Sequence, residues 1–153
     1  MSYAERLTVP LRWWAQATML LASLWLAFVV ALPAAAAWTI AAIAAALVAG
    51  CLLWYGGARI TITDGELRAG RAHIPTRLVG GADPLDAEAT RRIAGVEADA
   101  RAYLLLRPYL KRAVKVEIAD PADPTPYWLL STRHPDRLAN ALATTAPEAG
   151  AAG

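Results

Sequence analysis

The densest group of basic side chains in the sequence comprises Arg107, Lys111, Arg112 and Lys115. Pro108 and Tyr109 stand between the first two and predict a hairpin turn, with the charges in and beside it. An anionic membrane surface attracts each nearby lysine or arginine by about 1 kcal/mol, so the cluster suits acidic lipid headgroups or an acidic protein partner. A solvated loop, or a determinant of membrane orientation, accounts for the same charges without any ligand.

Two adjacent aromatic residues, Tyr127 and Trp128, follow a proline-rich connection at residues 120–126. On a strand their rings lie on opposite faces, so one ring is expected in the core. The other could meet a protein partner or the membrane surface, and we select Tyr127 as the candidate contact residue. Core packing of both rings is the simpler interpretation.

Metal chemistry has few possible ligands in this sequence. The two histidines, His73 and His134, are separated by predicted strands and have no paired carboxylate or thiolate at ligand spacing. The only cysteine, Cys51, lies in an apolar stretch, so an intramolecular disulfide is impossible. We therefore predict no metal site and no cofactor.

Nucleophilic and acid–base chemistry is also poorly represented. Ser131 and Thr132 lack the glycine-flanked pattern of a nucleophile elbow. Asp120 and Asp123 could form a carboxylate pair, but their alternation with proline is typical of turns. We therefore predict no catalytic residue and a protein that is not an enzyme.

Charge is distributed very unevenly along the chain. Residues 13–58 contain no Asp, Glu, Lys, Arg or His, a segregation that soluble proteins rarely show. The formal net charge is only +2. Nucleic-acid binding requires a dense basic face, so we expect no nucleic-acid partner. The uncharged stretch predicts a membrane protein instead.

The uncharged stretch is long enough for two membrane-spanning helices, since each needs about 20 residues. Pro33 divides it near the middle. We predict helices over about 13–32 and 36–55, which form a transmembrane hairpin within residues 1–57. A signal-peptide cleavage site near residues 32–36 is the rival interpretation, although the apolar run is long for one.

The orientation of this hairpin follows from its flanking residues. Arginines precede the first helix and follow the second, and the connection between the helices carries no charge. The positive-inside tendency then places both termini in the cytoplasm, in a multi-pass protein of the cell membrane.

Small residues recur every four positions in the second helix, at Ala42, Ala46 and Gly50. This spacing lets two helices approach closely. We expect the face to pack on the first helix, and contact with a second copy of the chain is the alternative.

Residues 58–145 alternate between strand and turn signals and predict a small, mostly antiparallel β domain. Asp64-Gly65 predicts a tight hairpin turn, and Asp83-Pro84 predicts the start of a helix that ends near Gly95. A closing helix from Pro135 carries Leu138 and Leu142 at helical spacing. The predicted strands are residues 59–63, 66–69, 73–79, 102–107, 114–118 and 127–132.

These elements indicate an α+β membrane protein whose β domain is one strongly bent sheet or partial barrel, closed by the last helix. The residues after Thr145, 146–153, are rich in alanine and glycine and are expected to be a disordered tail.

Several strings of the sequence closely resemble an actinobacterial membrane-protein family known as domain of unknown function 3093. They include Glu5-Arg6-Leu7 before the paired tryptophans, the run at residues 64–70, Arg107-Pro108-Tyr109, and the proline-rich run that ends at Pro135. The order of elements also resembles bacterial pleckstrin-homology-like domains that follow transmembrane hairpins. The resemblance implies this architecture and an actinobacterial source, but no activity.

From these features we expect a membrane-tethered interaction or scaffold module, which binds membrane lipids or a protein partner at the cytoplasmic face. An accessory subunit of a membrane complex is an alternative, as is a membrane-bound enzyme of unknown type.

Overall fold

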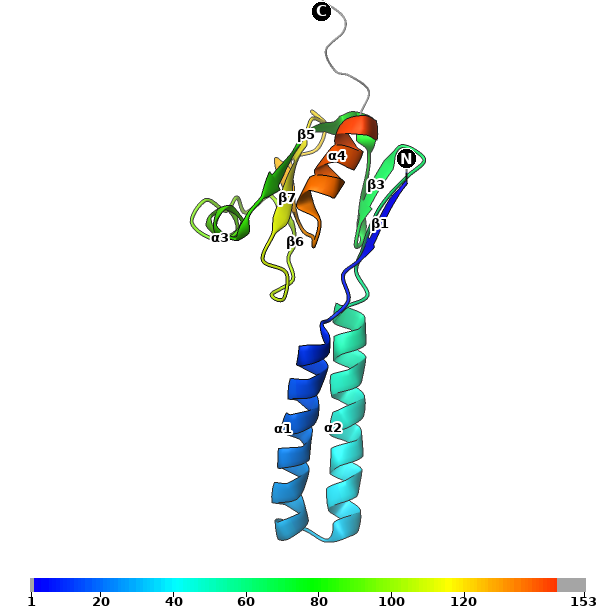
Figure 1. Cartoon of the computed structure of the whole chain (residues 1–153), viewed down its shortest axis with the longest axis vertical. Helices are drawn as coiled ribbons and strands as arrows, with labels where there is room; N and C mark the ends of the chain where they lie inside the picture. The colour runs from blue at the N-terminus through cyan, green and yellow to red at the C-terminus, as the bar shows by residue number, and fades with distance from the viewer. Residues whose placement is uncertain (1, 146–153) are drawn as a thin grey trace, which may run out of the picture. The chain divides into compact units, whose positions relative to one another are not determined.

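The computed structural model describes residues 2–145, and within them the chain forms two compact units (Figure 1). One unit contains residues 8–58, and the other combines the N-terminal residues up to Leu7 with the chain from Arg59 onward. The residues of the described chain up to Leu7 therefore share a unit with the chain that follows the two helices. The tail predicted at residues 146–153 lies outside the described residues.

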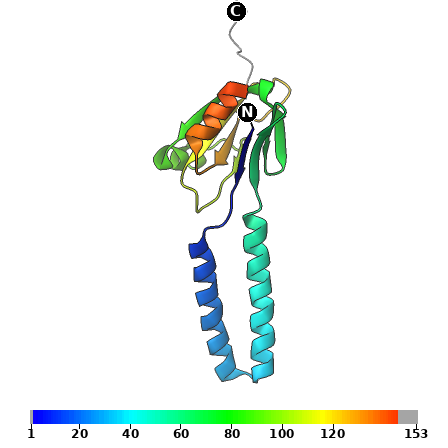
Figure 2. The same cartoon turned by 45° about the vertical axis from the view of Figure 1, so that its right-hand side comes forward.

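The first unit is a hairpin of two long apolar helices, α1 (Leu11–Ala31) and α2 (Ala34–Tyr55), which lie side by side (Figures 1 and 2). Pro33 breaks the helical stretch as predicted, because proline disfavours a helical residue before it. Each helix begins after a proline, and α2 ends where the N–H of Gly56 donates to the carbonyl oxygen of Leu52. Both helices are about 32 Å long.

The face of α2 that meets α1 is not the predicted one. Ala37 is fully buried, and the rings of Trp25 and Trp38 lie 5.0 Å apart across the hairpin. Because each helical residue turns by about 100°, Ala42 lies about 140° around the helix from Ala37. Ala42 and Gly50 are accordingly exposed, and a Cβ atom added to Gly50 would meet nothing within 4 Å.

The second unit contains an antiparallel four-stranded sheet in the order β1-β2-β3-β4. Asp64 and Gly65 join β2 to β3 with positive φ angles of 52° and 73°, as a tight hairpin turn requires. The bounds are β1 (Tyr3–Arg6), β2 (Arg59–Thr63), β3 (Glu66–Ala69) and β4 (Ala72–Pro75).

The strand β1 is the main feature of this sheet that the sequence did not reveal. It pairs with β2 along its whole length, from Tyr3 opposite Ile62 to Arg6 opposite Arg59. The helical hairpin is thus inserted between two neighbouring strands of one sheet. Four residues are too short for a recognisable alternation, and the partner strand lies more than 50 residues away.

A second four-stranded sheet has the order β5-β7-β8-β6, with β6 parallel to β8 and the other pairs antiparallel. The described residues therefore form two sheets rather than one bent sheet. The strands are β5 (Val79–Leu85), β6 (Tyr103–Leu105), β7 (Ala113–Ile118) and β8 (Tyr127–Ser131), and a 3-10 turn, η1 (Thr76–Leu78), precedes β5.

The helix expected from Asp83-Pro84 begins later than predicted. Pro84 lies in β5, which is an edge strand and so tolerates a residue without an N–H. The helix α3 (Ala87–Ala94) starts after Asp86, whose Oδ1 accepts a 2.7 Å hydrogen bond from the N–H of Ala89.

The core lies on both faces of β8, in which every residue is buried. On one face, α4 (Pro135–Thr145) packs on the second sheet through Leu138 and Leu142, as predicted. On the other face, α3 covers a smaller cluster formed by Ala113, Tyr127 and Leu129. The two sheets are joined where the hydroxyl of Tyr103 donates a 3.0 Å hydrogen bond to the carbonyl oxygen of Ala69.

Candidate functional site: the basic loop after β6

Three of the four basic residues of the predicted cluster lie in the loop 106–112, which connects β6 to β7. This loop is not the predicted hairpin turn, because β8 lies between β6 and β7 in the sheet. The loop must therefore cross the end of β8. Its side chains consequently meet segments far along the chain, which the sequence could not indicate.

Arg107 is anchored at the start of this loop. Its main-chain N–H donates a 3.1 Å hydrogen bond to Oγ of the fully buried Ser131. Its own Nη1 donates to the carbonyl oxygen of Leu106 at 3.2 Å. Arg107 is half-buried, and its main chain is fixed to the core through Ser131.

Lys111 and Arg112 are exposed at the end of the loop. Nη2 of Arg112 donates a 2.9 Å hydrogen bond to the carbonyl oxygen of Arg133. The carbonyl oxygen of Arg112 accepts a hydrogen bond from the N–H of Thr132. Arg112 is thus partly occupied in holding the loop to the chain that follows β8.

Lys115 is separate from the loop. It lies on β7, with its Nζ atom 3.8 Å from Glu117 and 5.0 Å from the centre of the Tyr127 ring. The Glu117 carboxylate carries the opposite charge, and the face of the Tyr127 ring adds a weaker attraction. The structure therefore does not assemble the four basic residues into one cluster.

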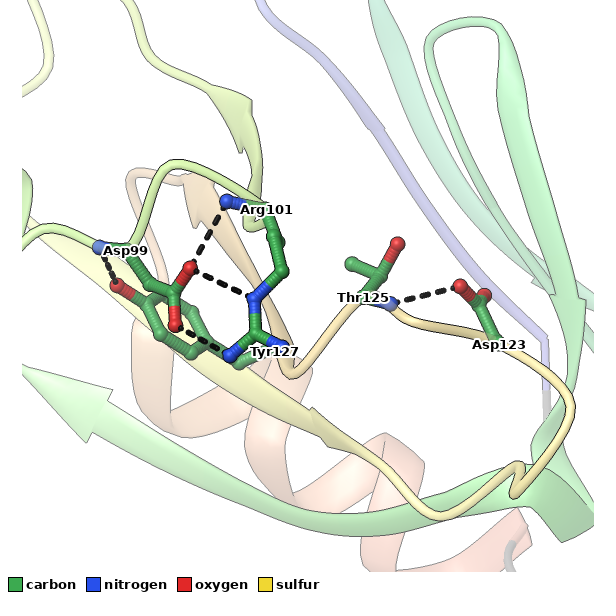
Figure 3. Close-up of polar contacts among 5 residues, drawn as sticks. All are labelled: Asp99, Arg101, Asp123, Thr125 and Tyr127. Atoms are coloured by element: carbon green, nitrogen blue, oxygen red, sulfur yellow. Dashed lines mark hydrogen bonds and ion pairs between the residues drawn. The ribbon is translucent and has the colours of Figure 1, made fainter.

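Tyr127 is a core residue and not an exposed contact residue. Its side chain is buried, and its hydroxyl oxygen accepts a 3.2 Å hydrogen bond from the N–H of Asp99 (Figure 3). Arg101 holds the Asp99 carboxylate through its side chain and its main-chain N–H, and this lowers the pKa of Asp99. Trp128 is buried as well, so neither ring is available to a partner.

The proline-rich connection before β8 contains local turns, as its sequence predicts. Oδ1 of Asp123 accepts from the N–H of Thr125 at 2.9 Å (Figure 3), and Oδ1 of Asp120 accepts from that of Ala122 at 2.9 Å. Side chains that bond the backbone two residues on are typical Asx turns.

The loop also borders a hollow that the sequence did not predict. Arg107 and Lys111 line it from one side, and Thr90 and Arg91 line it from α3. The hollow has a cavity volume of about 300 Å³, and no carboxylate is found among the described residues that line it. Nothing in the sequence connects a helix before β6 with a loop after it, so this grouping depends on the fold.

A second cluster joins β1 to the chain after β8. The Glu5 carboxylate accepts hydrogen bonds from Oγ1 of Thr132, from the N–H of Arg133 at 2.8 Å and from the hydroxyl of Tyr3 at 2.8 Å. Burial raises the pKa of Tyr3 to about 12, and the bond to Glu5 adds to this rise, whereas that to Thr132 opposes it. The strings that carried the family resemblance, at Glu5 and before Pro135, therefore meet in space.

No group of three or more potential metal ligands occurs within residues 2–145. His73 lies 3.9 Å from Glu66 at the surface, and His134 is exposed before α4. Within residues 2–145, neither histidine therefore belongs to a group of three such ligands.

Comparison with known proteins places the chain in a family. Residues 2–142 match the family described as Protein of unknown function (DUF3093), and the chain belongs to this family. Searches of curated proteins and of solved structures found no significant match.

Proposed function

We propose that this member of the DUF3093 family is a membrane-tethered interaction module. The helical hairpin spans the cell membrane with both chain termini in the cytoplasm. The β domain, of the pleckstrin-homology-like kind, binds anionic lipid headgroups or a protein partner at the cytoplasmic face.

The surface of the hairpin is the observation that carries this proposal. Large apolar side chains point outward along both helices, with 71% of Leu20, 69% of Leu47 and 75% of Trp54 exposed. Soluble proteins rarely expose apolar patches of this extent. Helices of about 32 Å match the thickness of the hydrocarbon core, so lipid is the natural cover for these side chains.

The charges at the hairpin ends support the orientation. Arg12 stands in the first turn of α1 and Arg59 follows α2, whereas the connection at Leu32 and Pro33 is uncharged. A translocated connection and cytoplasmic ends therefore agree with the positive-inside tendency.

The covalent structure restricts the β domain to the membrane surface. Only residues 7–10 connect β1 to α1, and only residues 56–58 connect α2 to β2. Four residues can extend by at most about 14 Å. A domain held by two such short connections remains within reach of headgroups and of neighbouring membrane proteins.

The proposal is tested with the full chain in bacterial membranes. Alkaline carbonate should leave the protein in the membrane pellet, and reporters fused after Ser2 and at the C-terminus should both report the cytoplasm. Crosslinking in these membranes should then attach lipid or a partner protein to the β domain. Extraction by carbonate or an external C-terminus would contradict the proposal, and a partner of fixed stoichiometry would favour the accessory subunit.

A further inference from the structure

We infer that the hollow between α3 and the loop 106–112 is a binding site for a phosphate group. We name it the α3 hollow, and its polar lining comprises Thr90, Arg91, Arg107, Lys111 and Ser131. The inference rests on the proposed function, and it names the site at which the domain holds a phosphorylated headgroup.

Charge is the first argument for this site. Among the described residues, the side chains of Arg91 and Lys111 form no ion pair or hydrogen bond. Comparable arginines nearby are paired, since Arg92 lies 3.1 Å from Glu97 and Arg101 lies 3.2 Å from Asp99. Cations that converge on one hollow without a carboxylate leave a local positive potential that an anion would neutralise.

The buried hydroxyl groups are the second argument. Thr90 is only 7% exposed, and its Oγ1 atom has no hydrogen-bond partner among the residues that the structure describes. A buried hydroxyl is rarely left in this state in a folded protein. Ser131 uses its Oγ to fix the start of the loop, so Arg107 is positioned at the hollow before any ligand arrives.

The remaining lining indicates an organic phosphate rather than a free ion. Leu106, Pro108 and Leu110 contribute apolar surface beside the charges. A phosphate ester with a glycerol or acyl portion would cover this surface, whereas inorganic phosphate would leave it hydrated.

The short connection between the β domain and α1 keeps the site within reach of a membrane lipid. The hydroxyl of Tyr109, in the same loop, donates a 2.7 Å hydrogen bond to the carbonyl oxygen of Leu7. Leu7 precedes Leu11, the first residue of α1, by four residues, so about 14 Å is the greatest extension between them. The loop therefore stays near the headgroup layer in the proposed topology.

The lipid test uses the full chain in nanodiscs of phosphatidylcholine with a photoactivatable phosphatidic acid. We expect crosslinks in residues 87–94 and 106–111, and at least about a tenfold lower yield in the R91Q/K111Q double variant. The R92Q/R101Q double variant loses the same charge outside the hollow and should keep the yield of the natural chain. Equal yields in both variants would overturn the inference.

A second experiment, with a soluble phosphate ester, identifies the source of the phosphate. In micelles of a neutral detergent, glycerol 3-phosphate should shift the amide resonance of Thr90 in the natural chain but not in R91Q/K111Q. Sodium chloride of equal ionic strength should leave this resonance unchanged in the natural chain. Binding in this arm without lipid crosslinks would assign the site to a free phosphate ester. No response in either arm would overturn the inference.

Two further outcomes separate this inference from the proposed function. Lipid crosslinks that map elsewhere on the β domain, for example around Arg133, would contradict the α3 hollow but leave lipid binding by the module intact. An acidic peptide that binds the hollow in place of lipid would likewise overturn the phosphate site and favour a protein partner.

Discussion

The hydroxyl of Tyr109 donates a 2.7 Å hydrogen bond to the carbonyl oxygen of Leu7, although 102 residues separate the two in the sequence. Both residues are buried. Tyr109 lies within the basic loop, and Leu7 is the last residue before the hairpin unit. This bond therefore joins the loop to the point at which the chain leaves the β domain.

The first prediction concerns the loss of this bond. Tyr109→Phe leaves the buried carbonyl of Leu7 without this donor, and we expect the free energy of unfolding to fall by about 1–3 kcal/mol. Denaturation of the full chain in neutral micelles, followed by the near-ultraviolet signal of the β domain, measures the change. The exposed substitution R101Q serves as a control with little effect. Equal stability of Y109F and the natural chain would show that the bond contributes nothing.

The second prediction concerns independent folding of the β domain. A chain in which residues 8–58 are replaced by a short glycine–serine linker should fold, because Arg6 and Arg59 are already paired neighbours. A fragment that begins at Arg59 lacks β1 and the fully buried Leu7, so we expect it to be poorly folded. Dispersion of amide resonances distinguishes the two. A well-folded fragment would mean that β1 is dispensable.

The parts of the fold differ in how far the sequence alone predicts them. The uncharged helices, the break at Pro33, the Asp64-Gly65 turn and the buried face of α4 were all predicted, because each leaves a local signal in composition or spacing. The strand β1 leaves none, since four residues gain their structure from a partner beyond the hairpin.

The candidate site was less predictable than the fold for the same reason. The charge of Arg107 and Lys111 was evident, but their neighbours Thr90 and Arg91 come from another element. Tyr127 was selected as exposed, because a single sequence could not show that α3 covers the face of β8 on which it lies. Sequence identified basic residues, and topology decided which of them share a surface.

The third prediction concerns pH. Tyr3 is neutral below its pKa, which the fold raises from the ordinary value of 10.0 to about 12. The unfolded chain therefore loses this proton first, and the contribution of Tyr3 to stability, complete below pH 10, is lost as the pH rises toward 12. The free energy of unfolding should fall more steeply over this range in the natural chain than in Y3F.

Ultraviolet difference absorbance provides an independent check of that assignment. The late ionisation of Tyr3 in the folded chain should be missing from the difference spectrum of Tyr3→Phe. A natural chain and Y3F with the same dependence on pH would contradict the raised pKa.

The fourth prediction tests the packing of α4. Leu138 is fully buried against the second sheet, so Leu138→Ala should lower the free energy of unfolding by about 2–5 kcal/mol. Asn140 is exposed on the same helix, and Asn140→Ala should change it by less than about 0.5 kcal/mol. Chemical denaturation of the full chain in micelles measures both. A loss well below 1 kcal/mol for L138A would mean that α4 does not hold the core together.

The last prediction tests which face of α2 meets α1. Ala37 is fully buried and Ala42 is exposed, so enlargement of the first side chain must displace α1 whereas enlargement of the second need not. We expect Ala37→Leu to destabilise the hairpin by about 1–3 kcal/mol, the usual effect of overpacking, and Ala42→Leu to leave it unchanged. The contact between Trp25 and Trp38 provides the measurement, because their fluorescence should change as the helices separate in a titration with denaturing detergent. If A42L instead proves the more disruptive variant, the small residues at 42, 46 and 50 form the interface after all, and the rotation of α2 described above is wrong.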